Sequence, residues 1–255
     1  MKTKSIVVGL GEIGRPIQKL ISKSELTIGF DVNKKLMNVE QFQKNANIPT
    51  KTLHICIPFT NNFHQNVISL CDKFSPKCLV IHSTVQPYTT KKLQNKLTIP
   101  VIFSPIRGVH KRMSYDLKRY TKFFAIESHA PKKTWAITTY SNLMKKCGVK
   151  TKKMSDPITL ELAKIICDTS YYGWLINYAQ MSKMIATKNH VDYDEMWTFS
   201  DEIEKFLGNR PKMRPGYIGG HCVIPNLELV QNETLNFIKK INSAFYIQMN
   251  LKKRK

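Results

Sequence analysis

The stretch SIVVGLGEIG, residues 5–14, decides the fold of this chain. Its first half is short and apolar, which predicts a buried strand over residues 5–9. Three glycines then follow the pattern G-x-G-x-x-G, and apolar side chains recur at helical spacing over residues 11–22. A second apolar run, residues 27–31, ends in an aspartate. The segment therefore predicts a strand, a tight turn, a helix and a second strand.

Each glycine of the turn has a role that a larger residue fills poorly. Gly9 permits the tight turn, Gly11 lets a pyrophosphate approach the backbone, and Gly14 lets the helix pack closely on the strand. Free N–H groups at the start of the helix favour an anion. At Asp31 a carboxylate accepts hydrogen bonds from ribose hydroxyls and repels a 2′-phosphate. These residues predict a site for NAD rather than NADP; the alternative is an ordinary glycine turn with a surface aspartate.

Strands and helices alternate through the first part of the chain. The predicted strands cover residues 53–57, 78–82, 101–103 and 122–126, and the predicted helices cover residues 67–74, 90–97 and 134–147. Such alternation is typical of a mostly parallel sheet covered on both faces. We therefore expect an α/β fold with a Rossmann-type doubly wound parallel sheet.

A mainly helical region follows. Asp156 is a predicted N-cap and Pro157 the first residue of one long helix over residues 157–188. The remaining predicted elements are a helix over residues 191–207, a glycine-rich loop, and a last helix over residues 227–248. We predict an NAD-binding domain over 1–152 and a helical domain over 153–255.

The composition is strongly basic. Forty Lys and Arg against eighteen Asp and Glu give a formal charge of +22, which favours anionic partners. The lysines are spread along the chain, so a general surface bias is the alternative. No apolar run is long enough for a membrane span, and no signal peptide is visible. The six scattered cysteines contain no C-x-x-C pair, so we expect a cytoplasmic protein without a disulfide framework or a metal site.

Three further motifs carry a family resemblance: HSTVQPYTT at residues 82–90, LELAK at 160–164 and GGHCVIPN at 219–226. With the glycine turn, they occur in the order found in nucleotide-sugar 6-dehydrogenases, the UDP-glucose and UDP-N-acetylmannosamine enzymes. The chain resembles this family over essentially its whole length, as a short divergent member lacking the C-terminal nucleotide-binding domain. The resemblance implies NAD as cofactor and a homodimer that uses the long helix.

The resemblance also implies roles for individual residues. Cys222 matches a cysteine whose thiolate attacks an aldehyde, Lys164 a lysine that stabilises negative charge on the substrate oxygen, and Thr84 a threonine near the nicotinamide. Asp168 and Asn226 match residues that position water and the oxyanion. The alternatives are a small residue in a tight turn at Cys222, a Lys164–Asp168 ion pair, and an ordinary turn residue at Thr84.

The sequence departs from the family at three places. The family has Asn at the position of Asp168 and Asp at that of Asn226, and it has a glutamate after Ser-Pro where this chain has Ile106. The basic loop that follows contains Arg107 and His110, which we expect to bind an anionic group of the substrate; a solvated loop is the alternative.

The predicted site has three parts. The cofactor-binding residues are Gly9, Gly11, Glu12, Ile13, Gly14, Asp31, Pro58, Ser83 and Thr84. The catalytic residues are Thr84, Lys164, Asp168, Cys222 and Asn226. The substrate-binding residues are Arg107, His110, Gly219, Gly220 and His221.

These residues favour one function over two others. The first is an NAD-dependent oxidoreductase that acts on an alcohol or aldehyde of an anionic, sugar-linked small molecule. The second is a non-catalytic NAD-binding or sensing protein, which the departures favour. The third is a nucleic-acid binder, for which the sequence contains no recognition motif.

Overall fold

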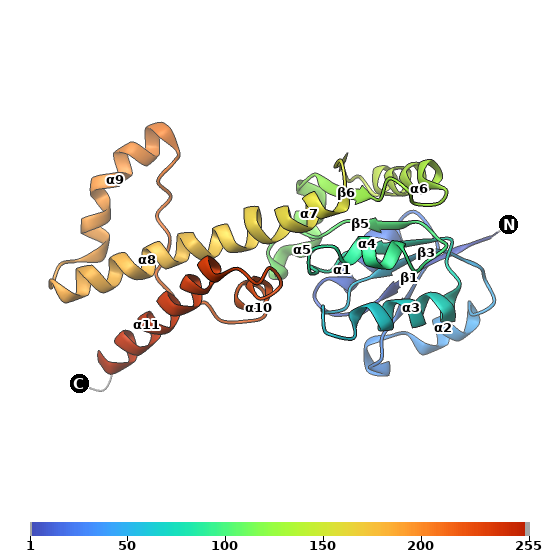
Figure 1. The fold of residues 1–255 in the computed structure, drawn as a ribbon, viewed down its shortest axis with the longest axis horizontal. Coiled ribbons are helices and arrows are strands. Elements are labelled where there is room, and N and C mark those ends of the chain that lie inside the picture. The colour runs from blue at the N-terminus through green and yellow to red at the C-terminus, as the bar shows by residue number, and fades with distance from the viewer. Residues whose placement is uncertain (1, 253–255) are drawn as a thin grey trace. The chain divides into compact units, whose positions relative to one another are not determined.

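The computed structural model describes residues 2–252, with the backbone alone described for His110, Leu251 and Lys252. It divides into two compact units, one up to Lys164 and one from Ile165 onward (Figure 1). The sequence-based domain boundary at 152/153 stays a prediction.

The first unit is built on a seven-stranded sheet in the order β2-β1-β3-β4-β5-β6-β7. The strands are β1 (Lys4–Val8), β2 (Thr27–Phe30), β3 (Thr50–Ile55), β4 (Cys78–Ile81), β5 (Val101–Phe103), β6 (Lys122–Ile126) and β7 (Thr151–Lys153). Strands β1 to β5 are parallel, whereas β6 pairs antiparallel with β5. The predicted Rossmann-type α/β fold is confirmed. Because β2 and β3 lie on opposite sides of β1, the strand order reverses there, and ligands of such sheets bind at that point beyond the carboxyl ends.

Helices cover both faces of this sheet. One face packs against α1 (Gly14–Ile21), α5 (Met113–Arg119) and α6 (Lys133–Lys146). The other packs against α3 (Phe63–Phe74), α4 (Thr89–Gln94) and α7 (Pro157–Ala163). The short α2 (Val39–Lys44) lies beside β2. Of these elements, α2, α5 and β7 were not predicted from the sequence.

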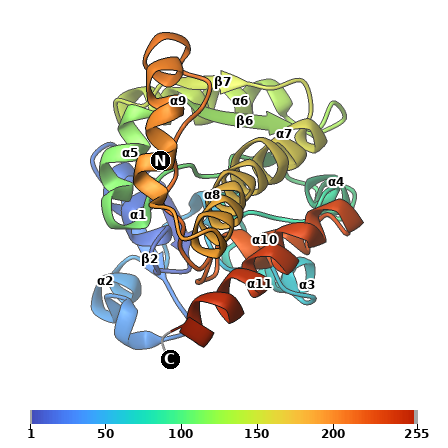
Figure 2. The ribbon, with the colours of Figure 1, turned by 90° about the vertical axis from the view of Figure 1, so that its left-hand side faces the viewer.

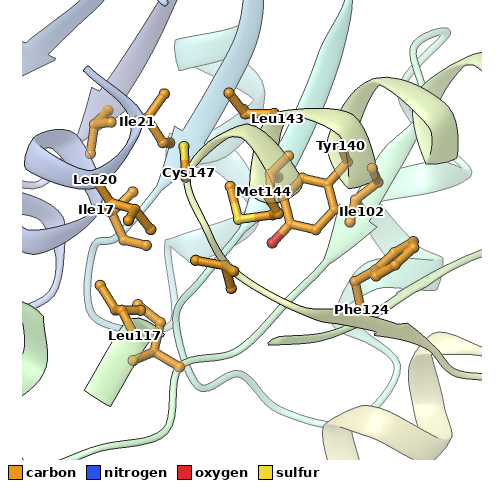
Figure 3. Close-up of a cluster of buried hydrophobic side chains, with 14 of the residues drawn as sticks. Ile17, Leu20, Ile21, Ile102, Leu117, Phe124, Tyr140, Leu143, Met144 and Cys147 are labelled. Carbon is orange, nitrogen blue, oxygen red and sulfur yellow. The ribbon is translucent and has the colours of Figure 1, made fainter. Parts of the chain in front are cut away.

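The core under α6 is shown in Figure 3. Tyr140 and Met144 point from α6 towards the sheet residue Ile102, and all three are at most 2% exposed. Ile17 of α1 and Leu117 of α5 complete the same cluster. This burial of apolar area is the main stabilising contribution to the first unit.

The second unit is helical. Its elements are η3 (Lys164–Ser170), which starts at the last residue of the first unit, α8 (Tyr171–Lys188), α9 (Tyr193–Leu207), α10 (Val223–Leu227), η4 (Glu233–Leu235) and α11 (Asn236–Lys252). Helices α8 and α11 run side by side (Figure 2). Gly173 lets α8 lie close to α10 and α11, because a Cβ there would lie 3.1 Å from Val223 and 3.4 Å from Ile238.

Two predictions for this region need correction. The long helix is not α-helical throughout, because η3 is a π-helix, in which backbone hydrogen bonds join residues five apart in sequence. The last helix does not begin at residue 227. Gln231 has a left-handed φ of +48°, and the Asn232 side chain accepts a hydrogen bond from the Thr234 N–H, so α11 starts only at Asn236.

Candidate functional site

The glycine turn joins β1 to α1 at the switch point of the sheet. Gly9 has a φ of +87°, and a Cβ there would lie 2.8 Å from the carbonyl oxygen of Cys56. A Cβ on Gly14 would lie 1.6 Å from the carbonyl oxygen of Gly9. At Gly11, by contrast, a Cβ would meet no described atom within 4 Å. The first and third glycines are therefore required by packing, whereas the second faces open space that a ligand can enter.

Asp31 ties the end of β2 to this turn. Its carboxylate accepts the Leu10 N–H at 2.7 Å and the Asn33 N–H at 2.8 Å. The side chain is therefore oriented by the turn itself and is more than a surface aspartate. A carboxylate has about four acceptor positions, so two remain for hydroxyl groups of a ligand. Two further turn residues, the exposed Glu12 and the half-buried Ile13, precede the start of α1.

The loops after β3 and β4 meet at the same carboxyl edge. The Ser83 hydroxyl donates to the Ile57 carbonyl, beside the exposed Pro58. Thr84 follows and is half-buried. The turn therefore places Ser83 and Thr84 next to the loop that begins at the end of β3.

Glu161 holds the loop that carries Thr84. It is 1% exposed on α7, and its carboxylate accepts the Tyr88 N–H at 2.6 Å and the Thr90 N–H at 2.9 Å. Burial raises the pKa of Glu161, and these hydrogen bonds act in the opposite direction. Lys164 lies three residues further on, half-buried, where α7 gives way to η3. Glu161 thus positions the loop, a role that the sequence did not reveal.

A buried polar cluster lies beneath this edge, and sequence analysis missed it. The rings of His54 and His82 are stacked, with His54 Nδ1 3.0 Å from His82 Nε2. His82 Nδ1 lies 3.0 Å from the carbonyl oxygen of Ser104, to which it must donate, so His82 Nε2 accepts from His54. The Tyr140 hydroxyl donates to the Ser104 hydroxyl at 2.8 Å. Burial and the charge of Lys122 lower the pKa of His54 to about 3, so both rings are neutral at physiological pH.

Lys122 is the charged member of the cluster. It is 5% exposed and donates to the carbonyl oxygens of Ser104 and Pro105. No carboxylate lies within ion-pair distance among the residues described, which is rare for a buried lysine. Burial is the main cause of a Lys122 pKa lowered to about 7, and the charges of Lys164 and Arg107 act in the same direction. Because β6 runs antiparallel to β5, this amine lies at the carboxyl edge of the sheet.

The basic loop after β5 is fastened at both ends. The fully buried Asp116 accepts the Val109 N–H at 2.9 Å, which lowers the pKa of its carboxyl group. The exposed Arg107 donates to the Thr121 carbonyl at 2.8 Å, with its guanidinium 4.8 Å from the Phe123 ring centre. The His110 side chain lies outside the described residues. Arg107 therefore has a defined position and keeps other N–H donors for a ligand.

In the second unit, two buried amides fasten the stretch before the cysteine. Asn242 of α11 accepts the Ile218 N–H at 2.8 Å and donates to the Ile218 carbonyl at 3.0 Å. Gln180 of α8 donates to the Gly216 carbonyl at 2.6 Å and to the Asn242 side chain at 2.9 Å. The residues directly before the loop with the candidate cysteine are therefore held in place by hydrogen bonds to α8 and α11.

The loop itself is open. Gly219 and Gly220 are exposed, and Gly220 has a left-handed φ of +76°. His221 is exposed, and Cys222 is half-buried directly before α10. Asn226 lies within α10, half-buried, and Asp168 lies in η3.

The predicted residues thus fall into two groups. The first unit brings together the glycine turn, Asp31, Pro58, Ser83 and Thr84 at one sheet edge, and it also contains Arg107 and Lys164. The second unit contains Asp168, Gly219, Gly220, His221, Cys222 and Asn226.

A comparison with protein-family models finds no match, and a comparison with curated protein sequences finds none either. Solved structures do match in fold. UDP-D-ManNAc dehydrogenase from Pyrococcus horikoshii has a TM-score of 0.77 at 16% identity, over 95% of this chain and 69% of that one. The chain therefore shares its fold with this enzyme.

Two other structures support the same conclusion. The UDP-N-acetyl-mannosamine dehydrogenase Cap5O from Staphylococcus aureus has a TM-score of 0.70 at 18% identity, over 98% of this chain and 70% of that one. The 3-hydroxyisobutyrate dehydrogenase of Mycobacterium tuberculosis has a TM-score of 0.69 at 14% identity, over 96% of this chain and 94% of that one. In the part of the chain that the structure describes, no helix has the length and apolar character needed to cross a bilayer.

Proposed function

We propose that this chain is an NAD-dependent oxidoreductase that oxidises an alcohol or aldehyde of an anionic, sugar-linked substrate such as a nucleotide sugar. The observation that carries the proposal is the glycine turn at the switch point of the sheet, with Asp31 bonded to the Leu10 N–H. The fold likeness to UDP-sugar dehydrogenases supports the choice of substrate class.

The residues at the turn fit a nicotinamide dinucleotide. The open space at Gly11 leaves room for a pyrophosphate, and Asp31 has acceptor positions for ribose hydroxyls. Its negative charge disfavours a 2′-phosphate, so NAD is preferred to NADP. When bound, the cofactor supplies a hydride acceptor.

The chain's own residues then have distinct roles. Lys164 stabilises negative charge on the substrate oxygen, and Thr84 lies at the edge where the reacting carbon binds. Cys222 is the nucleophile for an aldehyde, with Asp168 and Asn226 orienting the groups around it. Arg107 and His110, with the loop from Gly219 to His221, bind the anionic part of the substrate.

A second candidate is a single oxidation of a small hydroxy acid. The chain aligns with 94% of the length of the 3-hydroxyisobutyrate dehydrogenase, compared with 69% of the first UDP-sugar enzyme. The chain also has Ile106 where the resembled family has the glutamate used for hydrolysis. In this reading Cys222 has no covalent role.

Turnover separates these candidates. Purified protein with NAD and a panel of nucleotide sugars, sugar phosphates and small hydroxy acids is expected to produce NADH with a nucleotide sugar. Cys222→Ala should lose at least about a hundredfold in rate, as expected for removal of a nucleophile. Cys167→Ala, which removes an exposed thiol outside the proposed site, serves as control. Turnover on a hydroxy acid that survives in Cys222→Ala supports the second candidate, and no turnover on any substrate contradicts both.

We also propose a homodimer that uses α8. The exposed side chains Tyr171, Trp174, Tyr178, Met181 and Ile185 follow one another at alternating spacings of three and four residues. This is the spacing of the apolar seam of paired helices.

Light scattering after gel filtration tests the dimer. Wild-type protein should have twice the mass of the chain, and Tyr178→Glu should be a monomer, because a charge in the seam lacks a partner. Tyr115→Glu, an exposed tyrosine on α5, should remain dimeric. A monomeric wild-type protein contradicts the proposal.

A further inference from the structure

A pocket lies in the first unit, away from the glycine turn. This pocket is open to solvent, has a volume of about 490 Å³ and lies between α6 and the amino ends of two strands. Glu25, which precedes β2, and Lys51, near the start of β3, form one side. The glycine turn follows the carboxyl end of β1, so the pocket lies at the opposite edge of the sheet. Its volume is within the range of small-ligand sites, about 300–1,000 Å³.

Helix α6 has two different faces. Tyr140 and Met144 point into the core, where they are at most 2% exposed. The face towards the pocket instead carries Trp135, Thr138 and Asn142 on successive turns. The pocket is therefore lined by an aromatic ring and by neutral polar groups on one rigid helix.

This combination suits a particular ligand chemistry. The Trp135 indole is 37% exposed and offers a flat apolar surface. Thr138 has a hydroxyl that both donates and accepts, and Asn142 has an amide that does the same. A pyranose sugar has the complementary form, since one face of its ring presents C–H groups and its rim presents hydroxyls that donate and accept.

The charges in the pocket nearly cancel. Glu25 accepts a hydrogen bond from the Ser5 hydroxyl, and its other oxygen lies 3.5 Å from Lys51 Nζ. Lys146, at the end of α6, has no carboxylate at ion-pair distance among the residues described. The balance leaves one positive charge, which suits a sugar with a single carboxylate.

We propose that this pocket binds a pyranose sugar, with Trp135 against the ring face, Asn142 at the hydroxyl rim and Lys146 near a carboxylate. The sugar is free or is the terminal residue of a glycan, because both present the same ring. The site is independent of the proposed oxidation, since it lies at the other edge of the sheet.

The test is saturation-transfer NMR on the full chain with saturating NAD, using glucuronate and glucose as probes. Both sugars are expected to receive saturation, and the affinity for each should fall at least about tenfold in Trp135→Ala. Lys146→Met should weaken the binding of glucuronate and leave the binding of glucose unchanged. Asn142→Ala provides a second variant that removes rim hydrogen bonds, and thermal unfolding of each variant shows whether it is folded.

The control is Tyr115→Ala, which removes another exposed aromatic ring of the same unit and should leave binding unchanged. Binding of a glucuronate-terminated oligosaccharide, without binding of the free sugars, assigns the site to a glycan end. The proposal is overturned if no sugar binds, or if binding survives in both Trp135→Ala and Asn142→Ala. The readout needs no turnover, so its failure is distinct from failure of the proposed oxidation.

Discussion

Gly14→Ala is expected to destabilise the first unit by several kcal/mol and to abolish cofactor binding. The added Cβ would lie 1.6 Å from the Gly9 carbonyl oxygen, far closer than two non-bonded atoms can approach. Because the obstacle is backbone, α1 must move away from β1, and overpacking of this kind costs about 1–3 kcal/mol or more. Chemical denaturation followed by circular dichroism measures the loss.

Gly11→Ala is the matched control for this substitution. A Cβ at Gly11 meets no described atom within 4 Å, so the free energy of unfolding should change by less than about 1 kcal/mol. Its affinity for NAD should nevertheless fall, since the methyl group enters the space proposed for the pyrophosphate. Equal stability of Gly14→Ala and Gly11→Ala would contradict the packing assigned to this turn.

Raising the pH from 7 to 8.5 is expected to stabilise the protein through Lys122. The folded-state pKa of this amine is lowered by burial to about 7, below its ordinary value of 10.5. Above pH 7 the unfolded chain therefore binds more protons than the folded one, and the free energy of unfolding rises with pH. The gain over this interval is about 1.5 kcal/mol. Below pH 7 the amine is protonated in both states and the gain is absent.

Lys122→Met should remove this rise, whereas Lys118→Met, which changes an exposed lysine on α5, should retain it. The interval ends at pH 8.5 because burial raises the pKa of Cys56, Cys71 and Cys78 to about 12. Those thiols reduce stability as the unfolded chain loses its thiol protons, a loss that grows towards pH 9 and is the same in wild type and in Lys122→Met. Urea unfolding at both pH values gives the result. If the free energy of unfolding rises equally with pH in wild type and in Lys122→Met, the buried amine does not titrate in this range.

The sequence predicted those parts of the fold that depend on neighbouring residues. The glycine turn, β1 and α1 are decided within residues 4–21, where a single pattern determines the turn and the helical periodicity. Asp31 was correctly placed at the end of β2, though its bond to the Leu10 N–H needed the structure. The strand–helix alternation was enough to predict the parallel sheet.

The buried cluster could not be predicted, because it depends on the strand order. His54, His82 and Lys122 are far apart in sequence and each looks like an ordinary strand residue or strand-end residue. Only the pairing of β3 with β4 and the reversed direction of β6 bring them to one edge. The one sequence signal for this cluster was Lys122, a lysine at the start of an apolar strand.

The helical region was predicted in outline and corrected in detail. The cap at Asp156 was found, and its side chain accepts the Thr159 N–H at 2.8 Å. The π-helix η3 has no sequence pattern that distinguishes it from an α-helix. The break before α11 depends on a left-handed Gln231, a conformation that non-glycine residues adopt rarely and that periodicity does not reveal.

The central claim is that the first unit binds NAD at the glycine turn, and calorimetric titration of the full chain tests it most directly. NAD should bind with one site per chain, and NADP should bind at least about tenfold more weakly because Asp31 repels the 2′-phosphate. Asp31→Asn should narrow that difference. Absence of binding for both dinucleotides, or tighter binding of NADP by the wild-type protein, would contradict the account.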